Sequence, residues 1–142
     1  MNYWDKIKSF STLYENLMEP LKKKYELNQL ELDILMFLNN NPQYDTANEI
    51  VKIRHLTKSN VSSAVDYLEK RKLLKRERDE KNRKIIHLSL LSSADKIIAD
   101  GKKIQLVYGK TLIHGFSKEE KTLFKDFFER VCANTDEALK RN

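Results

Sequence analysis

The sequence predicts a mainly α-helical protein that carries one small β-hairpin. With three Gly and two Pro among 142 residues, few positions interrupt a helix, so long helices are expected. Apolar residues recur at intervals of three and four over most of the chain, which is the period of an amphipathic helix. The stretch from about residue 74 to 90 instead holds two extended runs around a charged turn, which predicts a pair of strands.

Residues 3–24 predict the first helix, and its apolar stripe is wide. The stripe contains Trp4, Ile7, Phe10, Leu13, Tyr14, Leu17, Met18 and Leu21. Pro20 lacks a backbone N–H, so we expect a kink or a new turn there. Because a small lobe covers less apolar surface than this stripe offers, we interpret the segment as a dimerisation helix, with Trp4, Ile7, Phe10 and Tyr14 at the interface. The alternative is a helix that only covers the core.

Two shorter helices are predicted between residues 28 and 54. Asn28 precedes a run of apolar residues at helical spacing, and the sequence Asn-Asn-Asn-Pro at 39–42 ends that helix. Thr46 and Glu49, three residues apart, form a capping-box signature that starts the next one. His55 and the residue after it then make a turn without Gly.

Residues 57–70 predict the helix on which the function depends. Thr57 is a suitable N-cap, and we expect the face that carries Val61, Val65 and Leu68 to be buried. The opposite face carries short polar side chains, which allow a helix to approach base edges and phosphates. The residues of this helix that we expect to contact DNA are Thr57, Lys58, Ser59, Asn60, Ser62, Ser63, Tyr67 and Lys70. An ordinary amphipathic surface helix is the alternative.

A hairpin with a basic tip is predicted next. Ile86, Leu88 and Leu90 alternate as in a half-buried strand, and a polar turn precedes them. Helix, turn, helix and hairpin in this order, from Thr46 to Ser89, form a winged helix-turn-helix, which holds one helix against the major groove of DNA. The wing residues that we expect to contact DNA are Arg78, Lys81, Arg83 and Lys84.

Charge is concentrated in the same segment. From Lys52 to Lys84 there are twelve Lys and Arg against five Asp and Glu, a net charge of +7, while the whole chain carries +6. Clustered positive charge favours phosphate binding, although charged runs are often only solvated surface.

Two helices are predicted after the hairpin. Ser92 or Ser93 is a suitable cap for the first, in which Gly101 and Gly109 predict a bend or close packing. A capping box at residues 117–120 starts the last helix. Its apolar stripe contains Leu123, Phe124, Phe127, Phe128, Val131, Cys132 and Leu139, of which Phe124, Phe127, Phe128 and Val131 are expected at a dimer interface. We expect Cys132 to be a buried small apolar residue of this stripe.

The run LTKSNVSSAVDYLEKRKLLKRERDEKNRKIIHLSL resembles the recognition helix and wing of MarR-type bacterial transcriptional regulators. The flanking helices also match that family in number and length, so the resemblance implies a single domain over 1–142. Within it, 28–91 is the DNA-binding lobe, and 1–24 and 92–142 are dimerisation helices. The chain departs from the family at three positions, where it has Asn82 for the usual Asp, Ser63 for a common Arg and Lys72 for the usual Gly.

The sequence offers no constellation for catalysis or metal binding. His55, His87 and His114 are scattered over different predicted elements, and no nucleotide-binding or nucleophile motif occurs. One Cys excludes an intramolecular disulfide, and peroxide-sensing relatives carry their reactive Cys near the N-terminus, where this chain has none. No stretch approaches the 18 or so apolar residues that span a membrane. We therefore expect no cofactor, no metal and a cytoplasmic location.

The leading hypothesis is a homodimeric, sequence-specific DNA-binding regulator that acts as a repressor at an inverted repeat and whose affinity for DNA a small ligand modulates. The resemblance implies a pocket between the DNA lobe and the dimer helices, often one that accepts aromatic acids or phenols. The second hypothesis is a winged-helix module that binds proteins without reading an operator, since fold alone does not fix function. An enzyme is a distant third.

Overall fold

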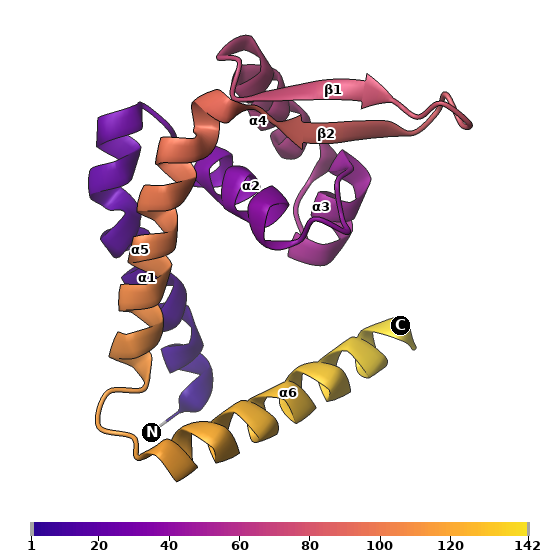
Figure 1. Ribbon diagram of the computed structural model, residues 1–142. Helices are drawn as coiled ribbons and strands as arrows, with labels where there is room; N and C mark the ends of the chain where they lie inside the picture. Colours follow the sequence, from indigo (N-terminus) through magenta and orange to yellow (C-terminus); the bar gives the residue numbers. More distant parts are fainter. Residues whose placement is uncertain (1, 142) are drawn as a thin grey trace. The chain divides into compact units, whose positions relative to one another are not determined.

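The computed structural model describes residues 2–141 and confirms the predicted fold class (Figure 1). In chain order the elements are α1 (Tyr3–Tyr25), α2 (Gln29–Asn40), α3 (Ala47–Arg54), α4 (Lys58–Lys70), β1 (Leu74–Arg78), β2 (Ile86–Leu90), a 3-10 turn (Ser92–Ala94), α5 (Asp95–Leu112) and α6 (Lys118–Lys140). The two strands pair in antiparallel fashion. One compact unit of the chain ends at Tyr108, and a second begins at Gly109.

The predicted capping boxes start α3 and α6. In α3, Thr46 Oγ1 accepts from Glu49 N at 3.2 Å, and Glu49 Oε2 accepts from Thr46 N at 3.2 Å. Ser117 and Glu120 make the same exchange at the start of α6. Each box satisfies backbone donors that the first turn of a helix leaves free, so these residues fix where the two helices begin.

Three helices end in a left-handed residue that is not glycine. These residues are Glu26 after α1 (φ 54°), His55 after α3 (φ 53°) and Lys72 after α4 (φ 59°). A leucine follows each one, and its N–H donates to the carbonyl five residues earlier, at 3.0 Å for Leu27, 3.1 Å for Leu56 and 2.9 Å for Leu73. All three leucines pack on the apolar core, and this burial offsets the backbone strain.

The core of the first unit surrounds α2, which buries residues along most of its length. Side chains from α1, α3, α4 and the hairpin join it. Its fully buried members include Met18, Leu32, Leu35, Ile50, Val61, Val65, Leu68 and Leu74. The inner face predicted for α4 is therefore confirmed, and α3 and α4 share one core that fixes the angle between them.

The start of α5 differs from the prediction. Ser92 and Ser93 both lie in the 3-10 turn, and Ser93 Oγ donates to Lys72 O, so neither caps α5. Close packing at Gly101 is confirmed, because a Cβ there would lie 2.5 Å from Met36 Sδ. A Cβ at Gly109 of the same helix would have no neighbour within 4 Å.

The first helix is continuous through Pro20, so the new turn considered there does not form. Tyr14 lies against Tyr108 of α5, with ring centroids 5.2 Å apart, and its hydroxyl accepts from Gln105 Nε2 at 3.0 Å. Tyr14 thus packs inside its own chain, which argues against the interface position we expected for it. Towards the N-terminus, by contrast, Trp4 is 78% exposed.

The second unit exposes its apolar stripe. No residue of α6 is buried, and Phe124, Phe127, Phe128 and Val131 are all exposed. The expectation that Cys132 is buried is wrong for the single chain, because the thiol is exposed along with its neighbours. None of the helices in residues 2–141 is both long enough and apolar enough to cross a bilayer.

Candidate nucleic-acid interface

Helix α4 presents a short polar face to solvent. Its N-cap is Thr57, whose Oγ1 accepts from Asn60 N at 3.3 Å, and its inner face is buried. The polar residues of the first two turns are Lys58, Ser59, Asn60, Ser62 and Ser63, and every one is exposed. A helix with small side chains on its outer face can approach a groove closely, so the geometry is suited to contact with base edges.

The C-terminal end of α4 is anchored to the end of α1. Arg71 Nη1 donates to Tyr25 O at 2.7 Å and to Glu26 O at 2.9 Å, which caps the last carbonyls of α1. Tyr67, which we had placed among the DNA contacts, donates from its hydroxyl to Glu26 O at 3.2 Å and stacks under the Arg71 guanidinium. The ring of Tyr67 is therefore engaged inside the chain, whereas Lys70 on the same helix is exposed.

A second anchor joins α4 to the first strand. Arg76 of β1 donates from Nη2 to Asp66 Oδ1 at 2.7 Å and from Nη1 to Glu69 Oε1 at 2.8 Å. Its backbone N–H also donates to Glu69 Oε2. Arg76 is one of the twelve cations between residues 52 and 84, but two carboxylates neutralise its charge. The contact holds α4 and the hairpin together.

The wing loop is organised by Asp79 and Asn82. Asp79 Oδ2 accepts from Lys81 N at 3.0 Å and from Asn82 N at 2.8 Å, and Asn82 Oδ1 accepts from Lys84 N at 3.1 Å. Both are side-chain turns of the kind that Asp and Asn favour. Arg78 Nη1 donates to Arg83 O at 3.0 Å, so Arg78 braces the loop. The departure from the usual Asp at position 82 is thus compatible with an ordered loop.

The loop between β1 and β2 carries three exposed cations, Lys81, Arg83 and Lys84. Within residues 2–141 none of their side chains makes an ion pair or hydrogen bond, so all three are available to a partner.

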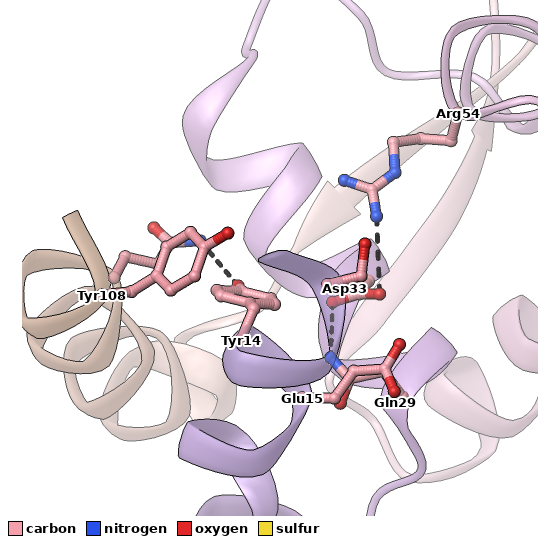
Figure 2. A pocket seen from close by; sticks show the side chains of 8 residues that line it. Tyr14, Glu15, Gln29, Asp33, Arg54 and Tyr108 are labelled. Carbon is pink, nitrogen blue, oxygen red and sulfur yellow. Dashed lines mark hydrogen bonds and ion pairs between the residues drawn. The ribbon is translucent and has the colours of Figure 1, made fainter. Parts of the chain in front are cut away.

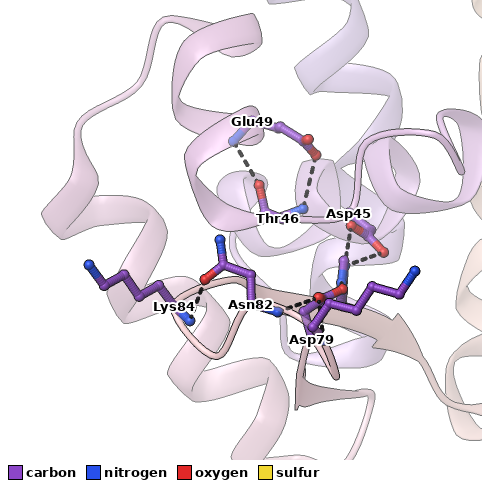
Figure 3. Close-up of polar contacts among 8 residues, drawn as sticks. Asp45, Thr46, Glu49, Asp79, Asn82 and Lys84 are labelled. Atoms are coloured by element: carbon purple, nitrogen blue, oxygen red, sulfur yellow. Dashed lines mark hydrogen bonds and ion pairs between the residues drawn. The ribbon is translucent and has the colours of Figure 1, made fainter.

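The ring of His87 and the carboxylates of Asp45 and Asp79 connect the wing loop to the start of α3; Figure 3 labels the two acids. His87 Nδ1 lies 2.9 Å and 3.0 Å from the two carboxylate oxygens of Asp45, and Nε2 lies 2.8 Å from Asp79 Oδ1. The hydrogen bond with Asp45, followed by that with Asp79, raises the pKa of His87 to about 9. The hydrogen bond from His87 in turn lowers the pKa of Asp79. The sequence pattern gave no sign of these partners, which lie 8 and 42 residues away in the chain.

A polar cavity of about 450 Å³ opens between α1, α2, α5 and the end of α3 (Figure 2). Asp33 accepts from Gln29 Nε2 at 2.9 Å and lies 3.5 Å from Arg54 Nη2. Burial raises the pKa of Asp33 and also that of Tyr14, which lines the same cavity with Glu15. Gln29 Oε1 is buried without a partner in the described chain. The cavity therefore offers acceptors to a ligand that donates hydrogen bonds.

The described residues offer a surface for binding. In residues 2–141 no group of three or more His, Cys, Asp or Glu side chains is placed to hold a metal ion. What the fold does bring together is the polar face of α4 and the exposed cations of the wing.

Residues 25–85 match the model of the MarR family. Among solved structures, the chain is similar to MarR, at 15% identity and TM-score 0.82, over 100% of this chain and 96% of that chain. It is similar to S. aureus MepR in a complex with DNA, at 21% identity and TM-score 0.77, over 94% and 96%. It is also similar to a MarR transcriptional regulator from Methanosarcina mazei Go1, at 19% identity and TM-score 0.81, over 96% and 97%. No curated protein matches the sequence.

Proposed function

We propose that the protein is a sequence-specific DNA-binding repressor of the MarR type. Residues 25–85 match the model of the MarR family, and the chain has the winged-helix fold of that family's transcriptional regulators. The observation that carries the proposal is the pairing of a short polar helix face with an exposed cationic wing. Such a regulator works where the DNA is, so we place it in the cytoplasm. Family and fold are those of transcriptional regulators and not of enzymes.

In this proposal α4 reads the major groove. Ser59, Asn60 and Ser63 contact base edges, because they are small, polar and exposed on one side of the helix. Thr57, Lys58 and Ser62 flank them and contact the backbone, and Lys70 meets a phosphate near the C-terminal end. Tyr67 is left out, because its hydroxyl and ring are engaged by the end of α1 and by Arg71.

The wing is proposed to enter the neighbouring minor groove. Arg83 and Lys84 are exposed beside the loop that Asp79 and Asn82 order, and a narrow minor groove concentrates negative potential that attracts Arg. Lys81 adds positive charge from the same loop. Arg78 is proposed to act indirectly, because its guanidinium donates a hydrogen bond to the carbonyl of Arg83 and so supports the loop.

A homodimer is the proposed binding species. The first unit exposes Trp4, Ile7 and Phe10 on α1, and the second exposes four large apolar side chains on α6. Apolar surfaces of this size are uncommon on stable monomers and favour an interface. A two-fold dimer prefers an inverted repeat with half-sites roughly 10 bp apart.

The polar cavity is the proposed effector site. The cavity is lined by residues of α2 and α3, which belong to the proposed DNA-binding lobe, and by residues of α1 and α5, which are proposed dimerisation helices. A ligand bound there would therefore contact both groups of helices. Asp33, Glu15 and the unpartnered Gln29 Oε1 favour a ligand with hydrogen-bond donors or positive charge. Arg54 lines the same cavity and lies 3.5 Å from Asp33, so one of the two carboxylates is already paired. Of the ligands that the family resemblance suggested, a phenol can donate a hydrogen bond to these acceptors, whereas an aromatic carboxylate cannot.

Selection of bound sequences from randomised DNA tests the function directly. We expect enrichment of an inverted repeat, and light scattering should show a dimer at micromolar concentration. Ala at Ser59, Asn60 or Ser63 should weaken the enriched site more than random DNA, because base contacts carry discrimination. Absence of any enriched sequence would favour the protein-binding module instead.

A further inference from the structure

His87 connects two parts of the chain, and the proposed DNA recognition depends on how these parts are positioned relative to each other. On one side its ring contacts Asp45, which directly precedes the N-cap of α3, and the carbonyl of Asp45 also accepts from Leu88 N at 2.7 Å. On the other side the ring contacts Asp79, whose second oxygen orders the loop that carries Arg83. The side chain of His87 is 34% exposed, so solvent protons can reach it.

Both ring nitrogens face carboxylates, and this geometry requires the imidazolium form. A protonated ring donates from both nitrogens, whereas a neutral ring donates from one and presents a lone pair at the other. In the neutral form that lone pair would face a carboxylate oxygen less than 3 Å away, at one of the two acids. One of the two contacts is therefore lost when the ring loses its proton.

We propose that His87 is a positioning residue for DNA recognition, which bridges Asp45 and Asp79 and so fixes the wing loop and Arg83 relative to the helix-turn-helix. The inference rests on the proposed DNA-binding function. His87 itself lies on β2 behind the loop and acts through the groups it holds.

Other charged groups lie near the ring on the neighbouring elements. Glu77 stands opposite His87 in the antiparallel register of the hairpin. The hollows on either side of the ring are lined by further charged side chains, namely Glu49 and Lys52 of α3 and Arg78, Glu80, Lys81 and Lys84 of the wing. Carboxyl and guanidinium groups ordinarily titrate outside the interval from about pH 7 to about pH 10, whereas histidine, cysteine, tyrosine, lysine and α-amino groups ordinarily titrate within or near it. All of these other groups remain in the His87→Arg variant, so a loss of affinity that wild type shows and this variant lacks is assigned to the imidazole of His87.

The sign of the pH effect follows from the raised pKa of His87. A histidine whose folded pKa lies above its unfolded value contributes fully below about 6.5, and the contribution is lost as the pH rises through about 9. The bridge is therefore intact at neutral pH and opens in alkaline solution, where affinity for DNA should fall.

The experiment uses the full chain and a labelled DNA fragment that the wild-type protein enriches from randomised DNA. Dissociation constants are measured by fluorescence anisotropy at constant ionic strength, at about pH 7 and about pH 10. The variants are His87→Arg, which keeps the charge and can donate in two directions, His87→Lys, which keeps the charge alone, and His87→Gln, which removes the charge. Circular dichroism at both pH values establishes that each variant is folded.

We expect wild type to lose about tenfold in affinity at the higher pH, a loss of the size expected for one direct DNA contact. His87→Arg should bind well at both values, whereas His87→Gln and His87→Lys should be weak at both. In an Arg83→Ala background, His87→Gln should add little, because the two changes remove the same contact.

Three results would overturn the inference. Equal binding by the Lys and Arg variants would show that charge alone matters. Full additivity with Arg83→Ala would separate His87 from the wing tip. A wild-type affinity that changes with pH no more than that of His87→Arg would remove the imidazolium bridge altogether, even if His87→Gln fails to fold. Failure of wild type to enrich any DNA would instead refute the proposed function and is distinguishable from all three.

Discussion

Replacing Lys72 by Gly should raise the free energy of unfolding, although the change removes a whole side chain. Lys72 follows the last turn of α4 with φ 59°, where its N–H donates to Glu69 O at 2.9 Å and the next N–H donates to Leu68 O. The left-handed conformation costs free energy for a residue with a Cβ, because the Cβ crowds the backbone, whereas Gly adopts it without this cost. The side chain is exposed, so no core contact is lost.

The expected change in the free energy of unfolding of Lys72→Gly is the difference between two effects. Relief of the left-handed strain is worth about 1–2 kcal/mol, and the greater freedom of Gly in the unfolded chain removes about 0.4–1 kcal/mol. We therefore expect a net gain of about 0.5–1 kcal/mol. A matched control is Lys102→Gly, an exposed position in the middle of α5, where the same change should cost about 1 kcal/mol.

Urea unfolding at one fixed protein concentration measures both variants, because the stability of an oligomer depends on concentration. The midpoint should move up for Lys72→Gly and down for Lys102→Gly, with unchanged slopes. If both variants lose stability equally, the left-handed residue after α4 is not strained and the reasoning fails.

Arg83→Ala should weaken binding of the enriched DNA by at least about 1 kcal/mol, with a loss that depends on flanking A·T content, whereas Lys81→Ala should show only a salt-dependent loss. Equal, sequence-independent losses in a salt series would reduce the wing to a source of charge. Gly101→Ala should destabilise the fold, because overpacking against Met36 costs about 1–3 kcal/mol and exceeds the gain of roughly 1 kcal/mol in helix propensity; a higher melting temperature would contradict this. Arg71→Met should leave the buried face of α4 intact but lower stability by about 1.5–3 kcal/mol, through loss of two charge-assisted hydrogen bonds to α1, and an unchanged urea midpoint would argue against that anchor.

Local patterns were sufficient for the elements, because helix periodicity, capping pairs and strand alternation depend on residues close together in sequence. The buried face of α4 and the capping box at Thr46 were both predicted in this way and are confirmed. Tertiary partners have no such local signature. Arg71 contacts a carbonyl 46 residues earlier, and His87 contacts Asp45 42 residues earlier, so neither role could be seen before the fold was known.

The number of basic residues can be read from the sequence, but the partners of each one depend on the fold. In the sequence, the twelve cations of residues 52–84 form one cluster of positive charge. In the fold, Arg54, Arg71 and Arg76 are committed to acceptors of the chain itself. These three hold α3 to α2, α4 to α1 and α4 to β1. Under the proposed function they position the surface that reads DNA, whereas Arg83 is a direct contact. A salt series of DNA binding should therefore detect the loss of Arg83 far more than the loss of Arg76.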